Sequence, residues 1–178
     1  MQIEEYQTLA MRTSPEGHDR ILNGCLGLIG ESGDIVDLVK KWRFQSGDHA
    51  EIPKDKLIDE CGDVLWYCAE LSDGLGLQLA EVSRRFMERV QAPICDNGMI
   101  HRAVVLSQVC GRAYDEIVDD DDRAGVSSTI GWIIKGISHF LVCYCNSTLE
   151  EAMERNIDKL RRRYPDGFDP ERSLHRKE

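Results

Sequence analysis

Apolar residues recur at helical spacing along most of the 178-residue chain, and stretches that alternate between apolar and polar residues are scarce. This pattern predicts at least five helices and disfavours a sheet. The segments that we expect to be helical cover residues 3–13, 20–44, 55–72, 77–91, 100–118, 127–145 and 148–163. The expected fold class is therefore all-α, a helical bundle.

Turn-forming residues separate these segments. Residues 14–17 (SPEG), 46–48 (SGD) and 73–76 (DGLG) carry the Ser, Asp, Gly and Pro residues that end one helix and begin the next. A further break over residues 93–98 divides the chain in two. We interpret the acidic run at residues 119–122 as a solvated loop in the second half, without a metal-binding role.

Length and composition restrict the class of protein. With 42% hydrophobic residues, a chain of this size can bury one core, so a single domain over residues 1–178 is expected. Its 32 acidic and 22 basic residues give a net charge of −10, which disfavours binding to nucleic acid.

The sequence also predicts a cellular location. Residues 1–13 do not resemble a secretory signal, and no apolar run approaches the roughly 20 residues that span a bilayer, so no membrane partner is expected. The seven cysteines are odd in number and show no C-x-x-C motif. We interpret them as buried thiols of a cytoplasmic protein, in the host cytoplasm if the protein is phage-encoded.

The candidate catalytic and metal-binding residues are two acidic pairs, Glu31 with Asp34 and Glu60 with Asp63. The i, i+3 spacing brings both side chains of a pair to one side of a helix, and the two pairs lie at equivalent positions beside their apolar stripes. If the helices pack antiparallel, the four carboxylates converge, and either raised pKa values or bound cations relieve their repulsion. Oxygen ligands select a hard cation, so Mg²⁺ is the predicted cofactor and Mn²⁺ can substitute for it.

Acidic pairs at this spacing are also common on solvated helix faces, and the residues alone leave this alternative open. Glycine recurs beside the first pair, at Gly24, Gly27, Gly30 and Gly33, where each glycine within a helix costs up to about 1 kcal/mol relative to alanine. The recurrence predicts that another helix or a ligand approaches these glycines closely. The alternative is that the helix begins later than residue 20. P-loop, zincin, hydrolase-elbow and Rossmann motifs are absent from the sequence, and the five histidines show no ligand spacing.

Three separated segments resemble one known family. Residues 27–37 (GLIGESGDIVD) and 59–67 (DECGDVLWY) resemble the E-x-x-[ED]…E-x-x-D signature of the MazG-like all-α NTP pyrophosphohydrolases. Residues 156–168 (NIDKLRRRYPDGF) resemble the N-x-x-K-L-x-x-R-Y-P-x-G-F ending of that family, and residues 5–13 resemble its first helix. The resemblance implies hydrolysis of a (d)NTP to (d)NMP and pyrophosphate, by attack of water on the α-phosphate.

The resemblance also implies residue roles. The four acids named above would hold the metal ions, while Lys56, Lys159 and Arg163 would contact phosphates with Asn156 nearby. From the residues alone, Lys159 and Arg163 at i, i+4 form a basic edge suited to a polyphosphate. The aromatic candidates to stack on a base, each with a core position as the alternative, are Trp42, Phe44, Trp66 and Tyr67.

The second half of the chain reads as a degenerate copy of the first. Residues 79–86 match residues 149–156 in polarity, and residues 100–118 and 127–145 then echo 20–44 and 55–72 without their acids. The predicted parts are catalytic helices (1–91), an inserted degenerate repeat (92–148), a basic C-terminal helix (149–168) and a tail (169–178).

Several alternatives stay open at this point. The basic helix could serve its own acidic site or that of a neighbouring subunit, and a homodimer or homotetramer is expected from the resemblance. A phosphoribosyl-ATP pyrophosphohydrolase and a non-catalytic helical partner protein are the alternative functions.

Overall fold

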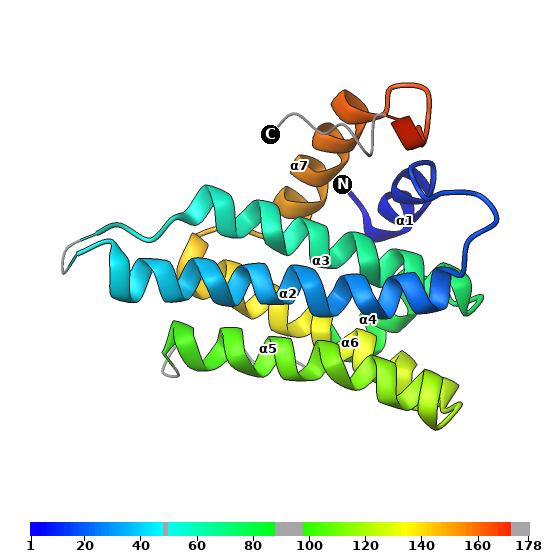
Figure 1. Ribbon diagram of the computed structural model, residues 1–178, viewed down its shortest axis with the longest axis horizontal. Helices are drawn as coiled ribbons and strands as arrows, with labels where there is room; N and C mark the ends of the chain where they lie inside the picture. The colour runs from blue at the N-terminus through cyan, green and yellow to red at the C-terminus, as the bar shows by residue number, and fades with distance from the viewer. Residues whose placement is uncertain (48–49, 88–97, 172–178) are drawn as a thin grey trace.

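The computed structural model describes residues 1–47, 50–87 and 98–171, and all regular structure in these ranges is helical. Figure 1 shows the elements in order. They are α1 (Ile3–Met11), α2 (Arg20–Gln45), α3 (Lys54–Gly74), α4 (Leu79–Met87), α5 (Met99–Tyr114), η1 (Asp115–Asp119), α6 (Arg123–Phe140), η2 (Leu141–Cys145) and α7 (Leu149–Arg163). The all-α prediction is confirmed.

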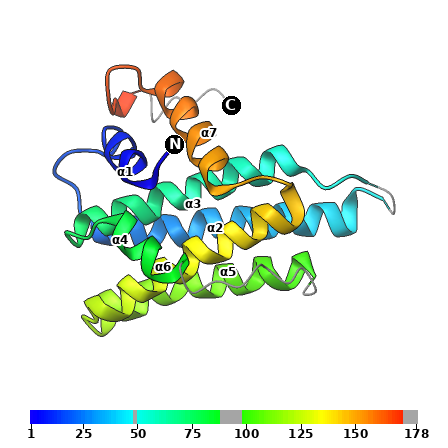
Figure 2. The ribbon, with the colours of Figure 1, turned by 180° about the vertical axis from the view of Figure 1, so that it is seen from behind.

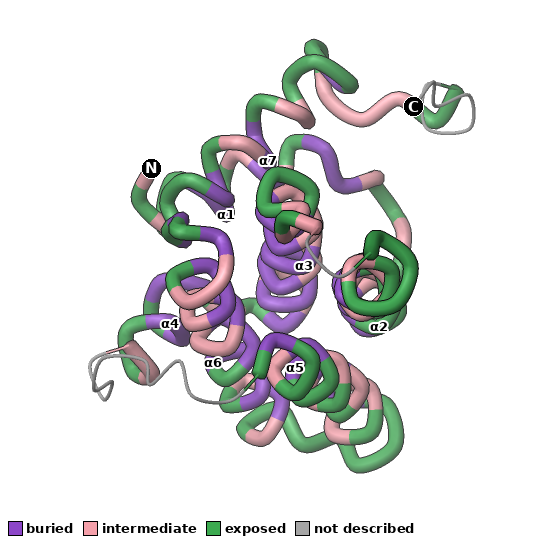
Figure 3. Tube along the Cα trace, turned by 90° about the vertical axis from the view of Figure 1, so that its left-hand side faces the viewer, coloured by how far each residue is buried: buried purple, intermediate pink, exposed green. Residues whose placement is uncertain are grey.

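Two antiparallel helical hairpins, α2–α3 and α5–α6, pack side by side through α2 and α5 (Figures 1 and 2). The shorter helices cover this bundle: α1 and α7 pack on α3, and α4 packs on α6. Seen along the bundle in Figure 3, the buried residues face the space between the helices, and α3 lies nearest the centre. The C-terminal helix α7 therefore packs on the first hairpin of its own chain, although it follows the second hairpin in sequence.

Side-chain caps set several helix starts. The carboxylate of Asp19 accepts hydrogen bonds from the amides of Ile21 and Leu22 and begins α2. Thr148 caps α7 in the same way, and Asp122 caps α6 through the amide of Gly125. Such caps satisfy amide groups that have no partner within the helix.

The acidic run at residues 119–122 differs in part from its prediction. Its side chains are exposed, as expected of a solvated loop, but Asp119 ends the π-helical turn η1 and Asp122 caps the next helix. The helix predicted to begin at residue 127 therefore begins at Arg123. Both predicted helices of this half also end in a π-helical turn, η1 and η2, which sequence periodicity does not reveal.

Two of the four recurring glycines are explained by helix packing. A Cβ atom on Gly24 would lie 2.8 Å from Cβ of Leu71, and one on Gly27 would lie 2.1 Å from the ring of Tyr67. Both glycines therefore let α3 approach α2 closely, as predicted. Gly30 and Gly33 are exposed, and a Cβ atom at either would meet no described neighbour within 4 Å, so close approach is not found there.

The segment Arg123–Cys145 is long and apolar enough to span a membrane, because an 18-residue window within it has a mean hydropathy of 1.3, whereas the sequence was expected to hold no apolar run of nearly that length. Half of this window is buried inside the bundle, where α6 packs against α4 and α5. A core helix of a bundle has the same composition.

Five of the six cysteines that the structure describes follow their prediction. Cys25, Cys61, Cys68, Cys110 and Cys145 are buried free thiols. Cys143 is disulfide-bonded, which corrects the expectation that every cysteine is a free thiol. Cys95, the end of the helix predicted over 77–91 and most of the predicted break at 93–98 lie outside the described residues.

Candidate metal centre

Three carboxylates from the first hairpin converge at the margin of the core. Glu31 of α2 and both Glu60 and Asp63 of α3 each bring one carboxylate oxygen within 4.8 Å of the other two. The antiparallel packing of α2 on α3 produces this convergence, because it places the two acidic segments opposite each other. All three side chains are half-buried.

Asp34 does not belong to this close group. It is exposed on α2, one turn beyond Glu31. Its negative charge still acts on the cluster, since it contributes to raising the pKa of Glu31 and of Glu60. The sequence predicted four converging acids; three converge, and the exposed Asp34 lies at the edge of the group, because α3 crosses α2 closer to Glu31.

The cluster carries more negative charge than its surroundings offset. Burial raises the pKa of Glu31 from 4.5 to about 7, and the neighbouring Asp63, Glu60 and Asp34 add to the effect. Burial, Asp63 and Asp34 raise the pKa of Glu60 as well. Lys159 opposes both shifts. Half-buried carboxylates in this state are suited to a divalent cation, because it would remove the repulsion that now favours their protonated forms.

Asp63 is held in place by α7. The Asn156 amide donates a hydrogen bond of 2.8 Å to Asp63 Oδ1, and the Lys159 ammonium contacts both carboxylate oxygens. Asn156 is almost fully buried and accepts a hydrogen bond of 2.9 Å from the Tyr6 hydroxyl of α1. A Cβ atom on Gly62 would lie 3.0 Å from Cβ of Asn156, so glycine at this position lets α7 lie close to α3.

A cavity of about 220 Å³ adjoins the cluster. Glu31 and Asp63 lie on its wall together with aromatic side chains and Arg163. The remaining lining residues come from the α1–α2 loop, α2, α3, α7 and the segment that follows α7: Thr13, Pro15, Asn23, Trp66, Tyr67, Leu160, Tyr164 and Phe168. The cavity thus offers carboxylates, a cation and flat apolar surfaces in one place.

Trp66 and Tyr67 form a fixed aromatic corner of this cavity. The Trp66 indole donates to the Thr13 hydroxyl at 3.0 Å and to the carbonyl of Ala10 at 3.2 Å. Its ring meets that of Tyr67 edge to face, with centroids 4.9 Å apart and an interplanar angle of 86°. Such anchored rings can bind a flat ligand without further ordering.

Three residues named from the sequence lie away from the cavity. Lys56 is exposed at the start of α3 and is not among the lining residues. Trp42 donates its indole N–H to the carbonyl of Ala50, and Phe44 is 72% exposed near the end of α2. Neither aromatic ring reaches the cavity, because α2 carries both beyond the acidic cluster.

Sequence reasoning missed a buried polar network beside the cavity. Glu70 is fully buried in α3 and accepts hydrogen bonds from Ser14 Oγ at 2.9 Å and from the Asn23 side-chain amide. His18 Nε2 lies 2.8 Å from the same carboxylate. The signal was a single acid within an otherwise apolar helical stretch, two turns after Asp63. Asn23 brings this network to the cavity wall.

Comparison with known proteins shows similarity to a phage protein. Over 68 residues the chain is 38% identical to the Gene 37 protein of Mycobacterium phage L5. The match covers 38% of this chain, which thus spans 60% of the length of the relative that it matches. The name of that protein states no activity. No family model matches the chain, and no solved structure matches it.

Proposed function

We propose that this protein is a Mg²⁺-dependent nucleotide pyrophosphohydrolase of the MazG type, which converts a (d)NTP to (d)NMP and pyrophosphate. One observation carries the proposal: three carboxylates converge beside a cavity that has an aromatic corner and an arginine. Metal ligands, a base-stacking surface and a cation for phosphate are the parts that such a reaction requires.

The donor set fits Mg²⁺, or Mn²⁺ in its place. Glu31, Glu60 and Asp63 offer only oxygen ligands at close range, and Asp34 lies at the edge of the group. When bound, the ion would supply charge neutralisation for the phosphates and activation of the attacking water. The burial of Glu31 and Glu60 disfavours the alternative of a non-catalytic partner protein. Burying a carboxylate costs free energy, and an acidic face that is fully solvated would avoid this cost.

The side chains of the cavity would divide the remaining work. Trp66 and Tyr67 bind the base, and Arg163 binds the phosphates through its guanidinium group. Water forms a bond to the α-phosphorus while the bond from this phosphorus to the pyrophosphate oxygen breaks, and a cluster carboxylate accepts the proton of the water. Lys159 keeps Asp63 oriented and adds positive charge beside the leaving pyrophosphate.

Association and location belong to the same proposal. Leu22, Leu26 and Ile29 form an apolar stripe on α2 and are each at least 40% exposed. Such a stripe supports a homodimer or homotetramer. The similarity to a phage protein supports the host cytoplasm as the site of action.

The test is a product assay with matched variants. The purified protein is incubated with Mg²⁺ or Mn²⁺ and a panel of NTPs, dNTPs and phosphoribosyl-ATP, and the products are separated by ion exchange. We expect monophosphate and pyrophosphate from one or a few nucleotides, with a loss of at least about 100-fold in Glu60→Gln and Asp63→Asn.

Glu81→Gln, an exposed acid on α4, is the control and should retain full activity. Release of diphosphate and orthophosphate would contradict the proposal, as would activity that survives both cluster substitutions. Cleavage of phosphoribosyl-ATP alone would favour that alternative substrate.

A further inference from the structure

The acidic cavity has two ends, and both helices of the first hairpin contribute to each end. Asn23 and Glu31 of α2 both line it, two turns apart, which is about 12 Å along the helix axis. On α3, Asp63 and Glu70 are likewise two turns apart. Because the helices are antiparallel, Glu31 lies close to Asp63, and the side-chain amide of Asn23 donates to Glu70. The cavity therefore has a carboxylate end and an amide end.

The aromatic corner lies between these two ends. Gly27 is midway along this side of α2, and a Cβ atom on it would lie 2.1 Å from the ring of Tyr67. Trp66 meets that ring edge to face. A nucleotide with its phosphates at the carboxylate end and its base on these rings would turn the far edge of the base toward the amide end. On a pyrimidine this far edge is carbon 4, which lies across the ring from the nitrogen that carries the sugar.

Glu70 determines which atom Asn23 turns to the cavity. The Glu70 side chain is fully buried, and an ionised carboxylate only accepts hydrogen bonds. Its Oε1 accepts from Ser14 and lies 2.8 Å from His18 Nε2, while its Oε2 accepts from Asn23 Nδ2. The amide nitrogen of Asn23 is therefore turned toward Glu70. Asn23 Oδ1 accepts no hydrogen bond from any residue that the structure describes, so this oxygen is left for a ligand.

Neighbouring polar groups are already engaged. The Thr13 hydroxyl donates to the carbonyl of Ala10 at 2.7 Å and accepts from the Trp66 indole at 3.0 Å. His18 Nδ1 lies against the carbonyl of Pro15. The amide end therefore presents a carbonyl oxygen with a buried carboxylate behind it. Such a surface favours a ligand group that donates a hydrogen bond.

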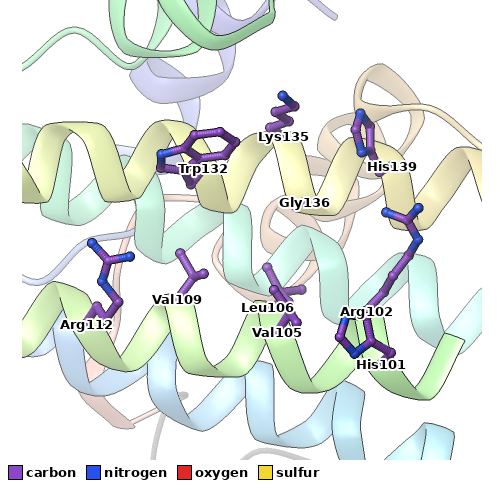
Figure 4. Close-up of a pocket in the computed structure, with 10 residues that line it drawn as sticks. All are labelled: His101, Arg102, Val105, Leu106, Val109, Arg112, Trp132, Lys135, Gly136 and His139. Atoms are coloured by element: carbon purple, nitrogen blue, oxygen red, sulfur yellow. The ribbon is translucent and has the colours of Figure 1, made fainter. Parts of the chain in front are cut away.

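The larger cavity, of about 270 Å³, lies between α5 and α6 and lacks these features (Figure 4). Its described lining residues are cationic, imidazole-bearing, aromatic or aliphatic, and none of them carries a carboxylate or a side-chain amide. It offers no oxygen ligands for a divalent cation and no amide oxygen for a base. We therefore assign the nucleotide to the acidic cavity.

We propose that the acidic cavity selects a cytosine nucleotide, and that Asn23 Oδ1 accepts a hydrogen bond from the 4-amino group of the base. Uracil and thymine carry an oxygen on carbon 4, which would face another acceptor. The cavity, at about 220 Å³, is smaller than most ligand sites, which begin near roughly 300 Å³, and this suits a pyrimidine better than a purine. Glu70 acts through Asn23 and is a positioning residue. The inference rests on the proposed function, because it assigns the base of that nucleotide.

Binding of nucleotides that resist cleavage tests this selectivity apart from hydrolysis. The probes are analogues of CTP, UTP, ATP, GTP and their deoxy forms in which NH replaces the oxygen between the α- and β-phosphorus. They are titrated calorimetrically into the full chain with Mg²⁺. We expect a cytosine analogue to bind roughly 10- to 100-fold more tightly than the matching uracil analogue, because uracil leaves two buried acceptors facing each other.

Two variants separate recognition of the base from packing. Asn23→Ala should bring the two affinities to within about threefold of each other, mainly by weakening the cytosine analogue. In Glu70→Gln the new amide oxygen keeps the Ser14 and His18 contacts, so the new amide nitrogen faces Asn23. Asn23 then turns its own nitrogen to the cavity, and the preference should shift toward uracil.

Controls distinguish this shift from a loss of stability. A merely structural role for Glu70 would weaken the cytosine and uracil analogues equally. Gln108→Ala removes an exposed side-chain amide of α5, outside both cavities, and should leave both affinities unchanged. Thermal melts verify that the variants are folded, and Asn23→Ala decides the result if Glu70→Gln is not.

Four results would overturn the base assignment. They are no binding of any cytosine analogue at millimolar concentration, equal or tighter binding of the uracil analogue, tighter binding of a purine analogue, and a cytosine preference that survives in Asn23→Ala.

A separate product assay keeps the two proposals distinguishable. If the cytosine analogue is preferred but neither CTP nor dCTP yields pyrophosphate, the hydrolysis proposal fails and the base assignment stands. If a uracil nucleotide yields pyrophosphate with a higher kcat/KM than its cytosine counterpart, the hydrolysis proposal stands and the base assignment is overturned.

Discussion

Replacing Glu31 with glutamine should stabilise the metal-free protein at alkaline pH. The ionised Glu31 carboxylate is half-buried beside Asp63 and Glu60, and these surroundings raise its pKa from 4.5 to about 7. Glutamine has nearly the same shape without the charge. The substitution therefore removes the electrostatic cost and keeps the packing.

The pKa shift sets the magnitude and the pH window. A carboxyl group whose pKa is raised on folding costs stability as the pH rises through the interval from 4.5 to about 7, and costs nothing below it. At 1.36 kcal/mol per pKa unit, the full cost above pH 7 is about 3 kcal/mol. Because solvent screens this partly exposed group, we expect about 1–2 kcal/mol, or a rise in Tm of about 3–6 °C at pH 8.

Thermal denaturation followed by circular dichroism in EDTA at pH 5 and pH 8 measures this effect. Glu31→Gln should raise Tm at pH 8 and change it little at pH 5. Added Mg²⁺ should stabilise the wild type more at pH 8 than at pH 5, and should stabilise the variant less than the wild type. Glu16→Gln, at an exposed carboxyl in the α1–α2 loop, is the control and should change Tm little at either pH.

Two results would refute the reasoning. Destabilisation of Glu31→Gln at pH 8 would mean that the ionised carboxylate makes a favourable interaction that outweighs its burial. An equal shift at pH 5 and pH 8 would mean that packing, and not charge, is responsible.

Three further predictions concern packing, phosphate binding and assembly. Gly27→Ala should destabilise the protein by about 1–3 kcal/mol in chemical denaturation, because the added Cβ would meet the ring of Tyr67. Gly30→Ala should be neutral or stabilising by up to about 1 kcal/mol, because a Cβ there meets no described neighbour within 4 Å. Arg163→Ala should lower kcat/KM for the nucleotide by about 10- to 100-fold, because Arg163 lines the cavity. Arg161→Ala, on the same helix and outside the cavity lining, is the control and should leave kcat/KM unchanged. Equal losses in the two variants would show a general charge effect. Sedimentation at micromolar concentration should show a dimer or tetramer, and a monomer would remove that part of the proposal.

The acidic cluster shows how far helical spacing can identify a site. The i, i+3 pairs correctly brought Glu31, Glu60 and Asp63 to the facing sides of two helices, because side-chain direction within a helix follows from local geometry. Helical spacing alone could not exclude Asp34, because the distance of Asp34 from the cluster depends on where α3 crosses α2.

The C-terminal helix shows the opposite limit. The sequence showed its basic edge, Lys159 and Arg163, but not which helices it packs against. The chain passes through the whole second hairpin before α7 returns to pack on the first hairpin. The contact of Lys159 with Asp63 joins residues far apart in the chain. No local pattern encodes such a pairing.

The sequence by itself determined the all-helical class, the starts of α2 and α7 and the identity of the acids, since each follows from periodicity, capping or composition within a few residues. Only the tertiary structure decided that Trp66 and Tyr67 line the cavity while Phe44 does not, and that Glu70 joins Ser14 in a buried network. These outcomes depend on crossing positions between distant helices, and the free energy that selects them comes from burial summed over the whole core.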